Sequence, residues 1–140
     1  GALIVRWEQG SRPLTVHARL GTVMPILTSA TGLIWLAFDP EHSEGLFESE
    51  LRRIEPPSRK IIRDVRLSDA KAAQKAGIAI ARGSMIGNVN ALACPVVGRS
   101  GKFAGVLTIL GLGGYFDGAP DGSNAKKLRA YPDEFGSKLE

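Results

Sequence analysis

Cysteine and histidine side chains are the first candidates for chemistry, and the sequence contains only Cys94, His17 and His42. A single cysteine excludes an intramolecular disulfide and a zinc cage built from cysteines, and two histidines are too few for most catalytic metal sites. Cys94 could be a nucleophile with His17 as its base. However, it lies among apolar residues of an expected strand, where a buried, inert thiol is typical. We therefore expect no enzyme, no metal and no cofactor, with a cysteine-dependent enzyme as the alternative.

A second possible chemistry is anion binding at the start of a helix within residues 24–37. Thr28 and Ser29 give a helix-capping signal before an apolar run. The first turn of a helix presents free backbone N–H groups, which can hold an anion. The small side chains there leave room for a ligand, and Met24 and Trp35 could form its walls. Taken alone, the pattern favours an ordinary capped helix of the core.

The charge distribution favours an acidic small molecule over nucleic acid as the partner. The net charge is +4, and all of this excess lies in residues 71–140. No carboxylate occurs between Asp69 and Asp117, so the local field there is positive. Six basic residues also gather in residues 52–66, but acidic residues are interspersed among them, as on a solvated helix surface.

The elements that must position these residues follow from hydrophobic periodicity and turn signals. Strands are expected at 2–7, 14–20, 78–82, 89–97 and 103–111, the first two forming a hairpin across 9–13. A loop is expected at 21–25 and another, rich in glycine, at 111–122. Helices are expected at 30–38, at 40–52, in a stretch after the break at 55–58, and at 123–131 and 132–139. A fresh cap at Ser68 starts a further helical stretch from Asp69 to Ala76, which Gly77 closes. Inward positions on the third helix are Ile61, Ile62 and Val65. This order predicts an α+β domain with an antiparallel sheet faced by helices.

Length and composition fit one domain over residues 1–140. The chain is 44% hydrophobic and 23% charged, which excludes disorder as its main state. No run of eighteen apolar residues predicts a membrane span, and no signal peptide is recognised at the start. A cytoplasmic location and no membrane partner are therefore expected. Because the chain starts at Gly1 rather than at Met, it is interpreted as a piece of a longer protein.

Four segments, taken in order and spacing, resemble the effector-binding domain of IclR-type transcriptional regulators. They are LTSATGLIWLA at 27–37, KAGIA at 75–79, ALACPV at 91–96 and GKFAGVL at 101–107. The resemblance implies a GAF-like (profilin-like) domain that senses a small, often acidic metabolite. It also implies assembly as a homo-dimer or tetramer, and DNA binding only through an N-terminal winged-helix domain that is absent from this chain.

By motif position, the resemblance also implies a set of pocket residues. They are Leu14, Val16, Met24, Ala30, Thr31, Asn90, Leu107 and Ile109, with Trp35 added as a possible wall. Leu107 and Ile109 stand where family members that bind small keto-acids tend to carry hydroxyls. We therefore predict a ligand with a carboxylate near Ala30, Thr31 and Asn90 and a sizeable apolar or aromatic body. A purely structural dimerisation module is a further alternative.

Overall fold

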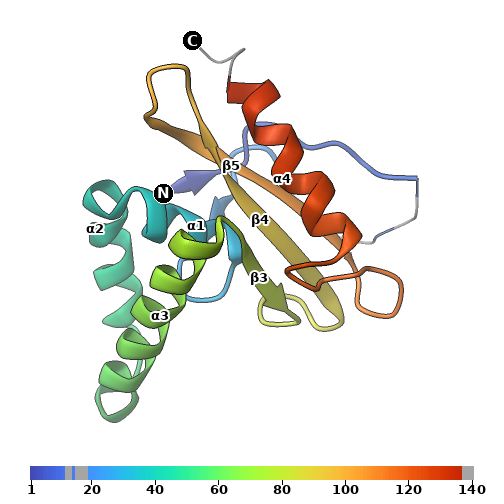
Figure 1. Ribbon diagram of the computed structural model, residues 1–140. Helices are drawn as coiled ribbons and strands as arrows, with labels where there is room; N and C mark the ends of the chain where they lie inside the picture. The colour runs from blue at the N-terminus through green and yellow to red at the C-terminus, as the bar shows by residue number, and fades with distance from the viewer. Residues whose placement is uncertain (12–13, 15–18, 137–140) are drawn as a thin grey trace.

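The computed structural model describes residues 1–11, 14 and 19–136, and these form an α+β fold with helices on both faces of an antiparallel sheet (Figure 1). The strands are β1 (Ala2–Leu3), β2 (Val23–Met24), β3 (Ala79–Arg82), β4 (Val89–Val97) and β5 (Phe103–Leu112). The helices are α1 (Ala30–Phe38), α2 (Pro40–Leu51), α3 (Pro56–Ala76) and α4 (Ser123–Gly136). The predicted fold class is confirmed.

The main sheet has the strand order β3-β4-β5, with both pairs antiparallel. A tight turn at 98–101 joins β4 to β5, as the sequence predicts, and Gly101 has the positive φ of +78° that such a turn favours in glycine. Directly paired residues of antiparallel strands project to the same face of the sheet. The register of β4 and β5 therefore divides their side chains into two sets.

One set packs under α1, and we call this side of the sheet the α1 face. It consists mainly of small residues with a few larger ones, namely Ala79, Ala81, Ala91, Ala93, Val106, Thr108 and Leu110. Above it lie the buried residues Leu33, Ile34 and Leu36 of α1, and α2 adds Phe47 and Leu51. The largest core of the domain is therefore built between the α1 face and helices α1, α2 and α3.

The other set packs under α4, and we call this side the α4 face. Its members Ile80, Leu92, Cys94, Leu107 and Ile109 meet Ala125 and Leu128 of α4. Leu92 and Leu128 are almost completely buried. Figure 1 shows α4 lying along this side of the sheet, away from α1, α2 and α3.

The helix after residue 55 differs from the prediction at its middle and on its inner face. It runs unbroken from Pro56 to Ala76, and Ser68 is an exposed residue within it rather than a cap. Ile61 and Val65 are 67% and 56% exposed, so only Ile62 of the three expected inward residues packs against the core. A capping-type residue is tolerated inside a helix when it faces solvent. The predicted end is confirmed, because Gly77 has φ +71°.

Both ends of the chain also depart from the prediction. The first strand is only two residues long, and it pairs with β2, which lies in a segment predicted to be a loop. The strand expected at 14–20 lies largely outside the described residues. At the other end, Pro132 lies inside one helix, α4, instead of starting a second one. Within the described part of the chain, none of the helices is both long and apolar enough to cross a bilayer.

Candidate functional site

The start of α1 is a capped helix N-terminus, as the sequence predicts. The hydroxyl oxygen of Ser29 accepts a hydrogen bond from the Gly32 backbone N–H at 2.8 Å, and the same hydroxyl donates to the Pro25 carbonyl oxygen. Gly32 makes this close approach possible, since a Cβ there would stand 2.3 Å from the Pro25 carbonyl oxygen. The turn before α1 and the first turn of α1 are therefore packed backbone against backbone.

Two charged side chains from neighbouring helices hold this turn, and sequence reasoning missed both. The Glu50 carboxylate of α2 accepts from the backbone N–H groups of Ile26 and Leu27, each at 3.0 Å. The Arg66 guanidinium of α3 donates to the carbonyl oxygens of Ile26 and Ser29, each at 2.7 Å. Burial lowers the pKa of Arg66, while the carboxylates of Asp69 and Glu50 oppose this shift. Only the fold brings together residues separated by 23 to 40 positions in the sequence.

A pair of hydroxyls links α1 to the sheet. Thr31 Oγ1 lies 2.7 Å from Thr108 Oγ1, within hydrogen-bond distance, and both residues are half-buried. Around this pair the α1 face presents alanines from β3 and β4, whose side chains fill little space. Thr31 was predicted as a site residue, whereas Thr108 was not. The pair places adjustable polar groups, able to donate or accept, on an otherwise apolar face.

Three of the predicted pocket residues lie on the opposite face of the sheet. Leu107 pairs with Cys94 and Ile109 with Leu92, so both project to the α4 face, where they pack near α4. Asn90 alternates with Leu92 on the same side, and its side chain is near Gly118. The predicted arrangement, with Ala30 and Thr31 beside these three residues in one pocket, is therefore wrong. A shift of one residue along a strand moves a side chain to the other face.

The structure places the other predicted residues in several parts of the N-terminal half, and one of them lies outside the described residues. The Trp35 indole N–H donates to Asp39 Oδ2 at 3.2 Å, and His42 Nδ1 lies 2.7 Å from Asp39 Oδ1, so Trp35 belongs to the junction of α1 and α2. With its carboxylate engaged in this way, Asp39 does not cap α2 through its side chain. Met24 is half-buried in β2, Leu14 is half-buried, Ala30 is buried in the first turn of α1, and Val16 lies outside the described residues.

The local environment of Cys94 opposes a role as a nucleophile. The residue is 1% exposed, and burial raises the pKa of its thiol to about 11. A thiol with that pKa stays protonated near neutral pH, whereas a reactive cysteine needs a thiolate. Its suggested base, His17, lies outside the described residues. Among the residues that the structure describes, no three His, Cys, Asp or Glu side chains are grouped so that they could hold a metal ion.

Comparison with solved structures identifies the fold. The Pseudomonas aeruginosa protein HmgR is 31% identical, with a TM-score of 0.81 over 99% of this chain and 55% of its own. An IclR-family transcriptional regulator from Brucella abortus is 22% identical, with a TM-score of 0.73 over 95% of this chain and 50% of its own. The Thermotoga maritima IclR protein is 18% identical, with a TM-score of 0.69 over 94% and 54%. The chain therefore has the fold of a domain that IclR-family regulators contain.

The resemblance of the four sequence segments is therefore confirmed. The IclR-type domain described here spans only 50–55% of the length of those three proteins. No protein-family model and no curated protein sequence matches the chain. The assignment thus depends on the fold, and it agrees with two of the motifs. The motif at 27–37 covers the turn before α1 and most of α1, and the motif at 91–96 forms the middle of β4.

Proposed function

We propose that this IclR-type domain is the sensing part of a transcriptional regulator and that its effector is a small carboxylic acid bound at the α1 face. The observation that carries the proposal is the hydroxyl pair Thr31–Thr108 between α1 and β5. Polar side chains placed on an apolar, small-residue face are the usual means of orienting a ligand in a mostly apolar site. The alanines beside the pair would accommodate the ligand's apolar body.

The start of α1 supports an acidic ligand, but it also limits where the acid group binds. A helix N-terminus favours negative charge through its N–H groups and its dipole. In the turn before α1, the N–H groups of Ile26 and Leu27 already bind the Glu50 carboxylate. The ligand's carboxylate would therefore bind at the first turn of α1, beside the Thr31 hydroxyl, rather than at the turn itself.

Regulation would follow from movement of α1. The turn before α1 is tied to α2 by Glu50 and to α3 by Arg66, so a displacement of α1 changes contacts on both helices. A ligand that binds one arrangement of these helices more tightly shifts the population toward it. We propose that this shift alters DNA binding by a winged-helix domain outside this chain, in a homo-dimer or tetramer.

The proposal is tested by thermal unfolding of the domain with a panel of aromatic and aliphatic carboxylic acids. At ten times its Kd, a bound acid stabilises the native state by about 1.4 kcal/mol, which raises the Tm by about 3–6 °C. The same acid should give less than half of that shift with Thr31→Val. The control Thr22→Val removes an exposed hydroxyl and should keep the full shift.

Two results would contradict the proposal. Either no acid in the panel raises the Tm, or Thr31→Val keeps the full shift given by an acid that does. If no acid binds while light scattering shows a stable dimer, the chain is a structural dimerisation module instead.

A further inference from the structure

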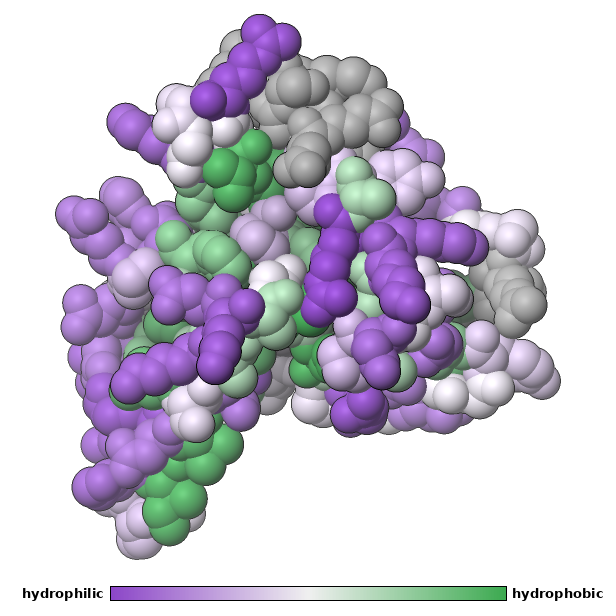
Figure 2. Space-filling view, in the orientation of Figure 1, coloured by the Kyte–Doolittle hydropathy of each residue, from purple (hydrophilic) through white to green (hydrophobic). Residues whose placement is uncertain are grey.

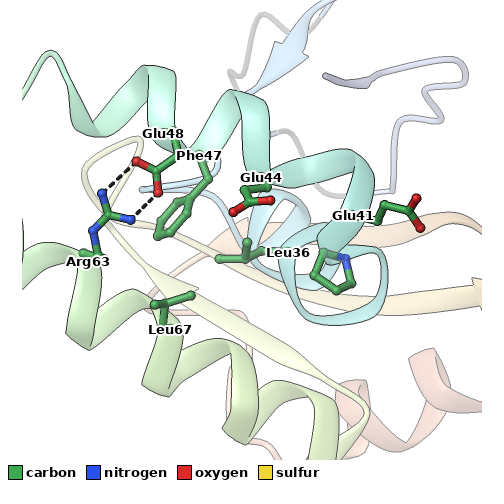
Figure 3. A pocket seen from close by; sticks show the side chains of 8 residues that line it. Leu36, Glu41, Glu44, Phe47, Glu48, Arg63 and Leu67 are labelled. Atoms are coloured by element: carbon green, nitrogen blue, oxygen red, sulfur yellow. Dashed lines mark hydrogen bonds and ion pairs between the residues drawn. The ribbon is translucent and has the colours of Figure 1, made fainter.

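A groove of about 290 Å³ lies between α2 and α3, apart from the hydroxyl pair of the proposed effector site. Figure 3 shows Leu36 and Phe47 between the two helices, with Leu67 on the α3 side. Leu36 and Phe47 are buried, whereas Leu67 is 39% exposed. The groove therefore has an apolar floor with one apolar side chain accessible along its edge.

The α2 side of the groove is acidic. Glu41, Glu44 and Glu48 are spaced by three and four residues, so they share one face of the helix, and all three line the groove. Glu48 forms a two-bond ion pair with Arg63 of α3, and the Arg63 guanidinium lies 5.9 Å from the centre of the Phe47 ring. This contact bridges the two helices, as the dashed lines in Figure 3 show.

Glu41 and Glu44 differ from Glu48 because no described lysine or arginine forms an ion pair with either of them. Both are exposed. The whole of α2 carries four glutamates and no lysine or arginine, hence a charge of −4 within a chain of net charge +4. The rest of the chain therefore carries +8. Because Glu48 is paired with Arg63 and Glu50 binds the turn before α1, the accessible negative charge of α2 is that of Glu41 and Glu44. These two carboxylates attract a cationic partner and repel nucleic acid.

We propose that this groove is a docking surface for a basic amphipathic helix of a protein partner. A third helix fits between two neighbouring helices by placing its apolar residues on their shared floor. Here the apolar residues of the partner would meet Leu67, the accessible apolar side chain of the groove. Lysine or arginine residues one helical turn apart would meet Glu41 and Glu44, which are themselves three residues apart. An acidic or uncharged helix would lose these ion pairs.

The docking surface is independent of the proposed effector site. The groove is lined by side chains of α1, α2 and α3, whereas the Thr31 hydroxyl faces Thr108 of β5. A partner bound in the groove would nevertheless contact α2 and α3, the two helices that hold the turn before α1 through Glu50 and Arg66. Displacement of α1 would therefore also change the contacts of a partner bound in the groove.

The test uses the full chain and a fluorescein-labelled 14-residue helical peptide of leucine and lysine, with a leucine–glutamate peptide of the same pattern as its counterpart. Anisotropy titrations are made with wild type, with the double variant Glu41→Gln/Glu44→Gln, and with Leu67→Ser. A matched control, Glu55→Gln/Asp121→Asn, removes the same charge from exposed positions outside the groove. All four residues of the two charge variants are exposed, and circular dichroism checks that every variant is folded.

We expect the lysine peptide to bind wild type and the control alike. Binding to the groove double variant should be about fivefold weaker, as for the loss of two exposed ion pairs. Leu67→Ser should also weaken binding, and the glutamate peptide should not bind. Equal affinity for the double variant and its control would overturn the proposal. So would binding of the glutamate peptide, unchanged affinity for Leu67→Ser, or no binding of the lysine peptide to wild type.

Discussion

The two faces of the sheet are built from the same three strands, yet they differ in chemistry. The α1 face carries small alanines and a hydroxyl pair, and the helix above it is held by charged side chains from α2 and α3. The α4 face carries larger apolar side chains and a buried cysteine beneath a single helix. A polar pair among small residues suits ligand binding, whereas an apolar layer without such a pair mainly stabilises the fold. The difference predicts separate effects on binding and on stability.

The largest effect is expected for Gly32→Ala, on the α1 side. The added Cβ would lie 2.3 Å from the Pro25 carbonyl oxygen and 2.6 Å from the Ile26 Cα, and both are backbone atoms that cannot move alone. We expect a loss of about 3–5 kcal/mol in the free energy of unfolding, or no folding at all, as for severe overpacking. Urea denaturation of purified protein measures it.

Gly45→Ala is the matched control, because Gly45 lies within α2 with open space around its Cβ position. Alanine has the higher helix propensity, so this variant should gain about 0.5–1 kcal/mol. If Gly32→Ala were as stable as wild type, the close packing of α1 against its preceding turn would not be essential.

The next effect is expected on the α4 face. Leu128 is 2% exposed and packs on the sheet, so Leu128→Ala should cost about 2–4 kcal/mol. Its exposed neighbour Lys127 provides the control, and Lys127→Ala should change stability by less than about 0.5 kcal/mol. Effector binding to folded Leu128→Ala should be unchanged. Weaker binding would show that the two faces are not separate in function.

A smaller effect is expected from a double-mutant cycle on the hydroxyl pair. Thr31→Val or Thr108→Val alone leaves one half-buried hydroxyl without its partner and should cost about 1 kcal/mol. The double variant should return to within about 0.5 kcal/mol of wild type, because valine matches the shape of threonine and neither hydroxyl is left unpaired. Additive losses would mean that the two hydroxyls do not interact.

The smallest effect concerns the junction that orients α1 relative to α2. The contact between Asp39 and His42 raises the pKa of His42 above 6.5 and lowers the pKa of Asp39 below 3.8. The stability from His42 is fully present below its unfolded pKa and is lost as the pH rises through the folded value. The stability from Asp39 is present above its unfolded pKa and is lost as the pH falls through the folded value.

Both contributions are therefore present together between about pH 4 and pH 6.5. In that window His42→Gln should lower the Tm by about 1 °C, and the difference should disappear at pH 8. A Tm difference that is constant from pH 4 to pH 8 would show that the ion pair between Asp39 and His42 does not contribute to stability. Thermal scans of both proteins across this pH range give the comparison.

Several elements could be read from the sequence because their signals are local. The strand at 89–97 and the helix at 30–38 have the predicted bounds, and Gly77 ends α3 as expected. Local signals failed at Ser68 and Pro132, where a capping residue and a proline lie inside continuous helices. In both cases the helix continues past the residue, because a residue type that favours a helix boundary does not by itself end a helix.

The sequence alone could not predict which side chains of β5 face α1 and which face α4. From Val106 to Leu110 the strand is nearly continuous in apolar residues, because helices cover both of its sides. Alternation identifies an inner face only when the other face is polar. The motif match consequently selected Leu107 and Ile109, while the hydroxyl facing α1 belongs to Thr108, which lies between them. The roles of Glu50 and Arg66 could not be predicted either, because their hydrogen-bond partners are backbone atoms distant in sequence.

Neighbouring residues of β5 provide the most direct test of the central claim that the effector binds at the α1 face. Thr108 faces α1 and Ile109 faces α4, so Thr108→Val and Ile109→Val change opposite faces by similarly small steps. The measurement is isothermal titration of each folded variant with an acid that stabilises wild type. We predict that Thr108→Val weakens binding at least fivefold, the loss of about one hydrogen bond to the ligand, while Ile109→Val leaves it unchanged. Unchanged binding to Thr108→Val together with weaker binding to Ile109→Val would contradict the account.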